Sequence, residues 1–284
     1  MKFPRGRATA IAAALMVVLG GLSLGAPAQA YEVATAPPAN VTGGAAVLTM
    51  PGSGLTTTYD QSGLTYLAGR TTLDSRGYVA SDYSQGVPPA ASPAVEFWTD
   101  AVNNCPASGS CSGLGTITVA FSQPVRNPVL NLAGMGGYVN LDIGNNGSVD
   151  QQSQYHVVLN LATAGLTMSK LSGGNLAVSG NSITAVNDNT GTSCSTTAQS
   201  GNPTPLSAQA TAACGSVRVN GVVTTLTFDV SSVHVPTSNS MPGYTDNVVT
   251  NANEHNQDNF LMAVTVPQDF GGCPPVVLRS RQRR

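Results

Sequence analysis

The strongest constraint on the fold is an alternating run of nine residues, VVTTLTFDV, at positions 222–230. Successive side chains of a β-strand point to opposite faces, which places Val222, Thr224, Leu226, Phe228 and Val230 on one face. The other face carries Val223, Thr225, Thr227 and Asp229. One mainly apolar face and one mainly polar face are typical of a strand in a sandwich of two sheets.

Eight further runs, rich in β-branched and aromatic residues and bounded by Gly, Pro, Asn and Ser, also predict strands. They lie at residues 45–50, 116–121, 128–132, 138–143, 155–160, 176–178, 216–219 and 260–266. One segment differs, because Ser92 followed by Pro93 predicts a short turn of helix over residues 92–101. Many strands without intervening helices predict an all-β fold: an antiparallel β-sandwich of lectin-like or jelly-roll type.

The first 30 residues predict a secretory signal peptide. Three basic residues among the first seven precede an apolar stretch at residues 8–24, and small residues at 26–30 favour cleavage after Ala30. A membrane anchor needs about 20 apolar residues and a stop-transfer flank, and this stretch is shorter. We therefore expect a secreted, extracellular protein with no membrane span.

The chain is expected to contain four segments. They are the signal peptide (1–30), an N-terminal extension (31–44), a single lectin-like sandwich domain (45–270) and a basic C-terminal tail (271–284). Charged residues make up only 9% of the chain, and Lys170 is the one lysine after the signal peptide. Because acidic residues outnumber basic ones before the tail, the composition argues against a nucleic-acid partner.

The chain has five cysteines, an odd number for an oxidising compartment. Cys105 and Cys111 close a short loop, and Cys194 and Cys214 bracket a loop rich in Ser, Thr and Pro. Local disulfides within these two couples are the simplest connectivity, although the spacing leaves other pairings open. Cys273 is then left over, either as an incidental thiol or as a site of self-association through an intermolecular disulfide.

The stretch at residues 113–143 predicts a strand, a turn, a second strand, a glycine turn and a third strand. Its FSQPVRNP (121–128) and LAGMGG (132–137) resemble the FSQPVTNP-like and LxxLGG phrases of a known family. This family is the lectin-like, non-repetitive adhesive domain of CshA-type fibrillar adhesins, which are Gram-positive surface proteins. Further phrases that agree with it lie at 176–183, 215–219, 225–230, 258–260 and 267–271.

The resemblance implies a lectin-like module for cell adhesion that binds host or matrix glycoproteins or glycans. Such adhesins continue into repeats and a sortase anchor, and we expect neither here. The protein is therefore expected to be secreted, or associated with the cell surface without such an anchor. The alternative is a structural protein of a coat or fibril that packs against copies of itself.

Motifs for catalysis are missing from the sequence. It has no G-x-S-x-G elbow and no H-E-x-x-H helix, and its three histidines have no cysteine or histidine at metal-ligand spacing. We therefore expect that the protein is not an enzyme and that it requires no cofactor.

One loop, LDIGNNGSVD at residues 141–150, has partial features of a calcium site. As Ca2+ ligands, Asp142, Asn146 and Asp150 would stand at positions one, five and nine of the loop. Position three is a glycine, however, position twelve is Ser153, and the flanks predict strands. A β-hairpin turning at residues 146–147 is therefore favoured, with Ca2+ as the alternative.

A polar segment near the C-terminus, TDNVVTNANEHNQDNF at residues 245–260, supplies candidate ligand-binding residues. Asp246, Asn247, Asp258 and Asn259 carry groups that hydrogen-bond sugar hydroxyls, and the ring of Tyr138 is suited to stacking on a sugar. A plain solvated loop is the alternative interpretation of this segment.

Overall fold

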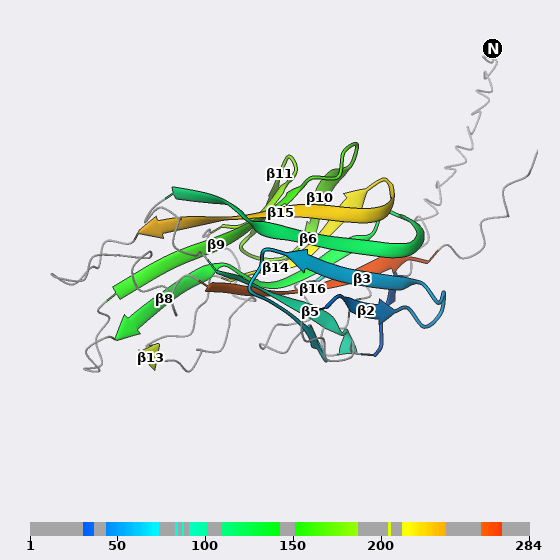
Figure 1. Ribbon diagram of the computed structural model, residues 1–284, viewed down its shortest axis with the longest axis horizontal. Helices are drawn as coiled ribbons and strands as arrows, with labels where there is room; N and C mark the ends of the chain where they lie inside the picture. Colours follow the sequence, from blue (N-terminus) through cyan, green and yellow to red (C-terminus); the bar gives the residue numbers. More distant parts are fainter. Residues whose placement is uncertain are drawn as a thin grey trace, which may run out of the picture.

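The computed structural model is an all-β sandwich of two antiparallel sheets, as predicted (Figure 1). It describes residues 31–36, 44–73, 83–84, 87, 91–100, 109–142, 151–186, 204–205, 212–236 and 257–268. No α-helix occurs within these ranges, and they contain no helix that is long and apolar enough to cross a membrane. The finer assignment to a lectin-like or jelly-roll type stays a prediction.

One sheet, here called the β16 sheet, has seven strands in the order β10-β14-β7-β16-β5-β4, with β1 also paired to β16. Its strands are β1 (Tyr31–Val33), β4 (Tyr66–Arg70), β5 (Ala94–Asp100), β7 (Val129–Met135), β10 (Thr167–Ser172), β14 (Ala213–Asn220) and β16 (Gln257–Pro267). The central strand is β16, which pairs with β7 on one side and with β5 and β1 on the other. Residues predicted as an N-terminal extension thus contribute a strand.

The second sheet, here called the β15 sheet, has nine strands in the order β11-β12-β9-β15-β6-β3-β2, with β8 beside β9 and β13 beside β8. Its strands are β2 (Ala46–Thr49), β3 (Thr56–Ser62), β6 (Gly109–Arg126), β8 (Gly137–Asp142), β9 (Gln151–Leu161), β11 (Leu176–Ser179), β12 (Ser182–Ala185), β13 (Thr204–Pro205) and β15 (Val222–Pro236). Each of the nine predicted strands overlaps an observed strand.

The main apolar core lies between the two sheets. Phe97 and Phe260 stack with ring centroids 5.7 Å apart, and both pack in the same cluster as Ile117 and Phe228. All four side chains are fully buried. Burying a side chain of this size stabilises the fold by about 1.5–3 kcal/mol.

The outer face of the β16 sheet is also covered. Leu73, Tyr83 and Val87 form a second apolar cluster with Leu261 and Ala263 of β16. Because both faces of this sheet are buried, β16 and β7 read as nearly continuous apolar runs instead of alternating ones.

The predicted helical turn at residues 92–101 is wrong, because β5 occupies most of this segment. Val95 and Phe97 point into the main core, and Glu96 lies between them on the opposite face. There Glu96 forms an ion pair with Arg70 of the neighbouring strand β4. Pairing on both sides, with β4 and β16, outweighs the local capping signal of Ser92.

The predicted alternation in β15 is confirmed for Leu226, Phe228 and Val230, which are buried. It is wrong at the start of the strand, where Val222 is 56% exposed and Val223 is buried. The reason is a bulge: Val223 pairs with Val125 but Thr225 pairs with Ala120, so four residues of β6, 121–124, stand opposite the single residue Thr224. A bulge of this kind shifts the alternation of the residues beyond it.

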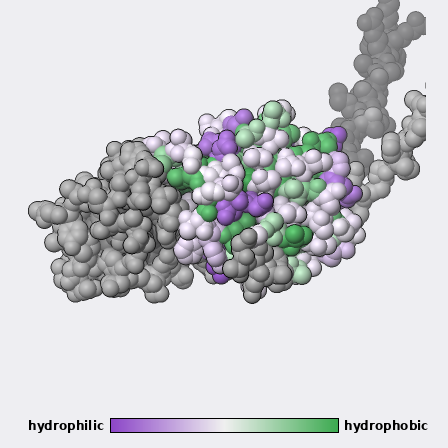
Figure 2. All heavy atoms as spheres, in the orientation of Figure 1, coloured by the Kyte–Doolittle hydropathy of each residue, from purple (hydrophilic) through white to green (hydrophobic). Residues whose placement is uncertain are grey.

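Among the described residues, four large hydrophobic side chains are exposed, and they lie on four different strands: Val47 on β2, Tyr66 on β4, Leu171 on β10 and Val222 on β15. On the face shown in Figure 2, hydrophobic and polar residues of the described part are interspersed. Single exposed apolar residues of this kind are normal for a protein surface.

Candidate functional site

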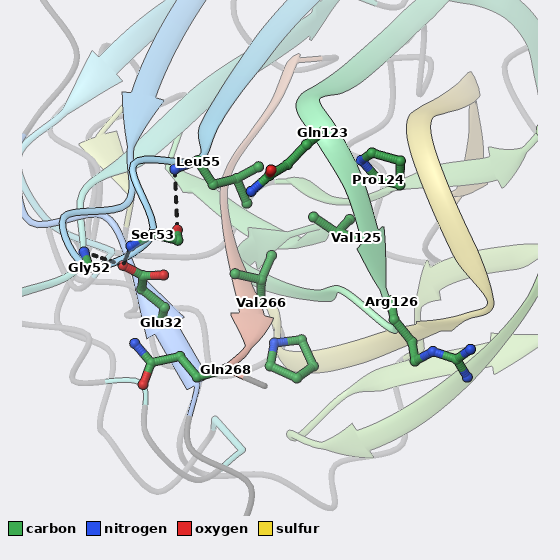
Figure 3. Close-up of a pocket in the computed structure, with 11 residues that line it drawn as sticks. Glu32, Gly52, Ser53, Leu55, Gln123, Pro124, Val125, Arg126, Val266 and Gln268 are labelled. Atoms are coloured by element: carbon green, nitrogen blue, oxygen red, sulfur yellow. Dashed lines mark hydrogen bonds between the residues drawn. The ribbon is translucent and has the colours of Figure 1, made fainter. Parts of the chain in front are cut away.

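A pocket with a volume of about 570 Å³ lies at one end of the sandwich, where the two sheets meet (Figure 3). Three parts of the chain form it: the β6 bulge, the turn between β2 and β3, and the ends of β1 and β16. The lining residues are Glu32, Gly52, Ser53, Leu55, Gln123, Pro124, Val125, Arg126, Val266, Pro267 and Gln268. The volume falls in the range of about 300–1,000 Å³ that is typical of small-molecule sites.

One wall of the pocket is the bulge in β6, which contains Gln123 and Pro124. Proline has no N–H for the sheet ladder, which favours a bulge at this position. The hydroxyl of Ser122 accepts a hydrogen bond from the Thr56 N–H at 3.0 Å and fastens the bulge to β3. The bulge leaves the side chains of Gln123 and Arg126 exposed at the pocket.

The opposite wall comes from the end of β16 and the residue after it, Val266, Pro267 and Gln268. Two of the phrases on which the family resemblance rests, residues 121–128 and 267–271, therefore contribute to the same pocket. Figure 3 shows Leu55, Gln123 and Val266 facing this space from the turn, the bulge and β16. The site thus combines an apolar floor with amide groups at its rim.

Glu32 of β1 is the one carboxylate among the lining residues that the structure describes, and it is only 6% exposed. Its Oε1 atom accepts hydrogen bonds from the backbone N–H groups of Gly52 and Ser53, the latter at 2.9 Å. Burial raises the pKa of Glu32, but hydrogen bonds from the Ser53 hydroxyl, from both backbone amides and from Gln268 together hold it below its usual value. Glu32 is therefore ionised at neutral pH and ties β1 to the turn.

We expect the substitution Glu32→Gln to destabilise the protein at neutral pH but not in acid. A carboxyl group whose pKa is lowered by folding stabilises the native state above its unfolded-state pKa, and this contribution is lost as the pH falls through the folded-state pKa. Melting temperatures of both proteins between pH 7 and pH 3 test this, with Asp60→Asn at an exposed carboxylate as the control. A difference that stays constant over the whole range would contradict the prediction.

Two of the candidate ligand-binding residues from the sequence, Asp258 and Asn259, are described in full and are not among the lining residues of this pocket. Asp258 is 5% exposed, and its Oδ2 atom accepts hydrogen bonds from the N–H groups of Gly136 (2.7 Å) and Val157 (3.1 Å). It thereby links β16 to β9 of the other sheet. Asn259 lies opposite Trp98 on β5, and Tyr138 lies opposite Gln154 on β9. Asp246 and Asn247 are outside the described residues, so ligand binding by this set stays a prediction.

The candidate calcium loop is described only at its start. Asp142 ends β8, where it pairs with Thr204, and Asn146 and Asp150 lie outside the described residues. The strands β8 and β9 that flank the loop are antiparallel neighbours, as the hairpin interpretation requires. Within the described ranges, no group of three or more His, Cys, Asp or Glu could hold a metal ion. Calcium binding stays a prediction.

Two of the five cysteines belong to the described part of the chain. Cys111 on β6 and Cys214 on β14 are both in the disulfide-bonded state. Cys105, Cys194 and Cys273 lie outside the described residues. The pairing within two local couples, and self-association through Cys273, therefore stay predictions.

Sequence reasoning missed Glu32, Gln123, Arg126 and Gln268 as site residues. The phrases at 121–128 and 267–271 carried a signal for three of them, because a proline flanked by polar residues inside strand-like runs favours a bulge or a strand end. Glu32 carried no such signal, because it is a single glutamate in the segment predicted as an N-terminal extension. Its role depends on the pairing of β1 with β16, which joins residues more than 230 positions apart, such as Tyr31 and Pro267.

In comparisons with family models, with curated proteins and with solved structures, no match to this chain was found.

Proposed function

We propose that this protein is a secreted or cell-surface binding module that attaches to extracellular glycans or glycoproteins through the pocket at the end of the sandwich. One observation carries the proposal: two separate phrases of the family-like pattern contribute to one pocket of small-molecule size. The resemblance to adhesive domains of CshA-type surface proteins supports the same function.

The chemistry of the pocket suits a polar ligand with apolar faces, such as a short oligosaccharide. Leu55, Val125 and Val266 offer apolar surface for the C–H faces of sugar rings. Gln123 and Gln268 carry both donors and acceptors, so their amides are suited to sugar hydroxyls. The long exposed side chain of Arg126 adds further donors at the rim.

The test is binding of the mature protein, residues 31–284, to an array of glycans and matrix proteins, with calcium and with chelator. We expect saturable binding to a small set of ligands. The double substitution Gln123→Ala and Arg126→Ala is expected to weaken it roughly tenfold or more, because each lost polar contact costs about 1 kcal/mol.

Lys170→Ala is the matched control, because it removes a positive charge from β10, which does not line the pocket. It should bind as the wild type does. Equal binding by the double variant and the wild type would place the ligand elsewhere, and an array without any saturable ligand would overturn the proposed function.

A further inference from the structure

The pocket contains a buried negative charge whose hydrogen-bond donors are all neutral. Glu32 accepts hydrogen bonds from Gly52, Ser53 and Gln268, none of which is charged. The other strongly buried glutamate of the described part, Glu96, differs because its carboxylate is paired with the guanidinium of Arg70. Buried carboxylates are normally compensated by a cation, and Glu32 has no such ion pair among the described residues.

The geometry directs this charge into the pocket. Figure 3 shows one carboxylate oxygen of Glu32 turned to the backbone of Gly52 and Ser53, while the other points toward Val266 and the interior of the pocket. The hydrogen bonds to the turn hold the carboxylate in place before any ligand arrives. A fixed charge of this kind favours a cationic group without the cost of ordering a flexible side chain.

We propose that Glu32 recognises the ammonium group of an amino sugar whose amine is not acetylated. This inference rests on the proposed function, because it names the ligand class of the same pocket. An ammonium group is compact and offers three donors to a carboxylate, and such charge-assisted hydrogen bonds are stronger than neutral ones. The amide of Gln123 remains for the sugar hydroxyls.

The second charged residue of the pocket restricts the ligand further. Arg126 is on the other side of the pocket from Glu32, with its guanidinium turned outward (Figure 3), and its positive charge disfavours a second ammonium group on that side. The pocket therefore selects a sugar with one free amine next to a neutral unit.

The test compares two disaccharides on the wild-type protein by calorimetric titration: β1–4-linked di-N-acetylglucosamine and the same disaccharide with one free amine. We expect the free amine to bind about tenfold tighter, because a hydrogen bond to a charged group is stronger than one between two neutral groups. In the variant Glu32→Gln this preference should vanish. The comparison of the two disaccharides on the wild-type protein needs no variant. It therefore tests the preference for a free amine even if Glu32→Gln folds poorly.

The outcomes separate this inference from the proposed function. Equal affinity for both disaccharides on the wild-type protein would overturn the inference and leave the binding function intact. A preference that persists in folded Glu32→Gln would also overturn it. The compound Nα-acetyl-lysine amide keeps a free ε-ammonium group. If it bound tighter than the amino sugar, the ammonium group would belong to a protein ligand, and the sugar assignment would be overturned. Saturable binding on the array only to glycans without a free amine would also overturn the assignment of an amino sugar.

Discussion

The substitution Gly215→Ala is expected to destabilise the protein by about 4 kcal/mol, because it combines a steric clash with backbone strain. Gly215 has a φ of 148°, in a region that other residues rarely adopt. A Cβ atom there would press directly on the carbonyl oxygen of Ser172 and lie 2.7 Å from the Cα atom of Gly173. These are backbone atoms, so no side-chain rotation relieves the contact between β14 and the end of β10.

Thermal unfolding monitored by circular dichroism measures this effect, with an expected drop in melting temperature of about 10 °C or more for a domain of this size. Gly180→Ala is the control for backbone strain alone. Its φ is 58°, and a Cβ atom there has nothing within 4 Å. It should cost only about 1 kcal/mol. Equal losses in the two variants would contradict the packing argument.

The substitution Asp258→Ala is expected to cost about 3 kcal/mol, because it leaves the N–H groups of Gly136 and Val157 without their acceptor. Val157 is fully buried and Gly136 is half-buried, so water cannot replace the carboxylate at the Val157 N–H. Denaturant unfolding at neutral pH measures the loss in free energy.

Two further variants separate the hydrogen bonds from the side chain's other properties. Asp258→Asn keeps an oxygen that accepts both bonds, so it should recover part of the loss. Asp60→Ala removes an exposed carboxylate of β3 and should be nearly neutral. A loss in Asp258→Ala no larger than in Asp60→Ala would show that the two hydrogen bonds contribute little.

Much of the fold could be predicted because the strands of the β15 sheet alternate in the sequence as they do in space. Leu226, Phe228 and Val230 face the core because nothing between them breaks the two-residue period. The prediction fails where a partner strand intervenes. Val222 and Val223 exchange faces because of four residues in β6, and nothing in β15 itself carries that information.

The missed strands have the same physical cause. Ala94–Asp100 forms β5 because β4 and β16 lie on either side of it, although Ser92 and Pro93 alone favour a helical turn. The pocket residue Glu32 was missed for a related reason, because β1 has only three residues and depends on β16 for its position. Local sequence patterns describe a segment, whereas these features depend on pairing between distant segments.

The central position of β16 has a consequence for the order of folding. The strands β5 and β7 are made early in synthesis, yet the strand that joins them is completed only at Pro267. Until then the β16 sheet is divided into two halves, and neither half has the buried neighbour that supplies Phe260, Met262 and Val264 to the core. Sheets assembled from such distant segments form slowly. The β16 sheet can therefore be completed only after this late segment has been synthesised.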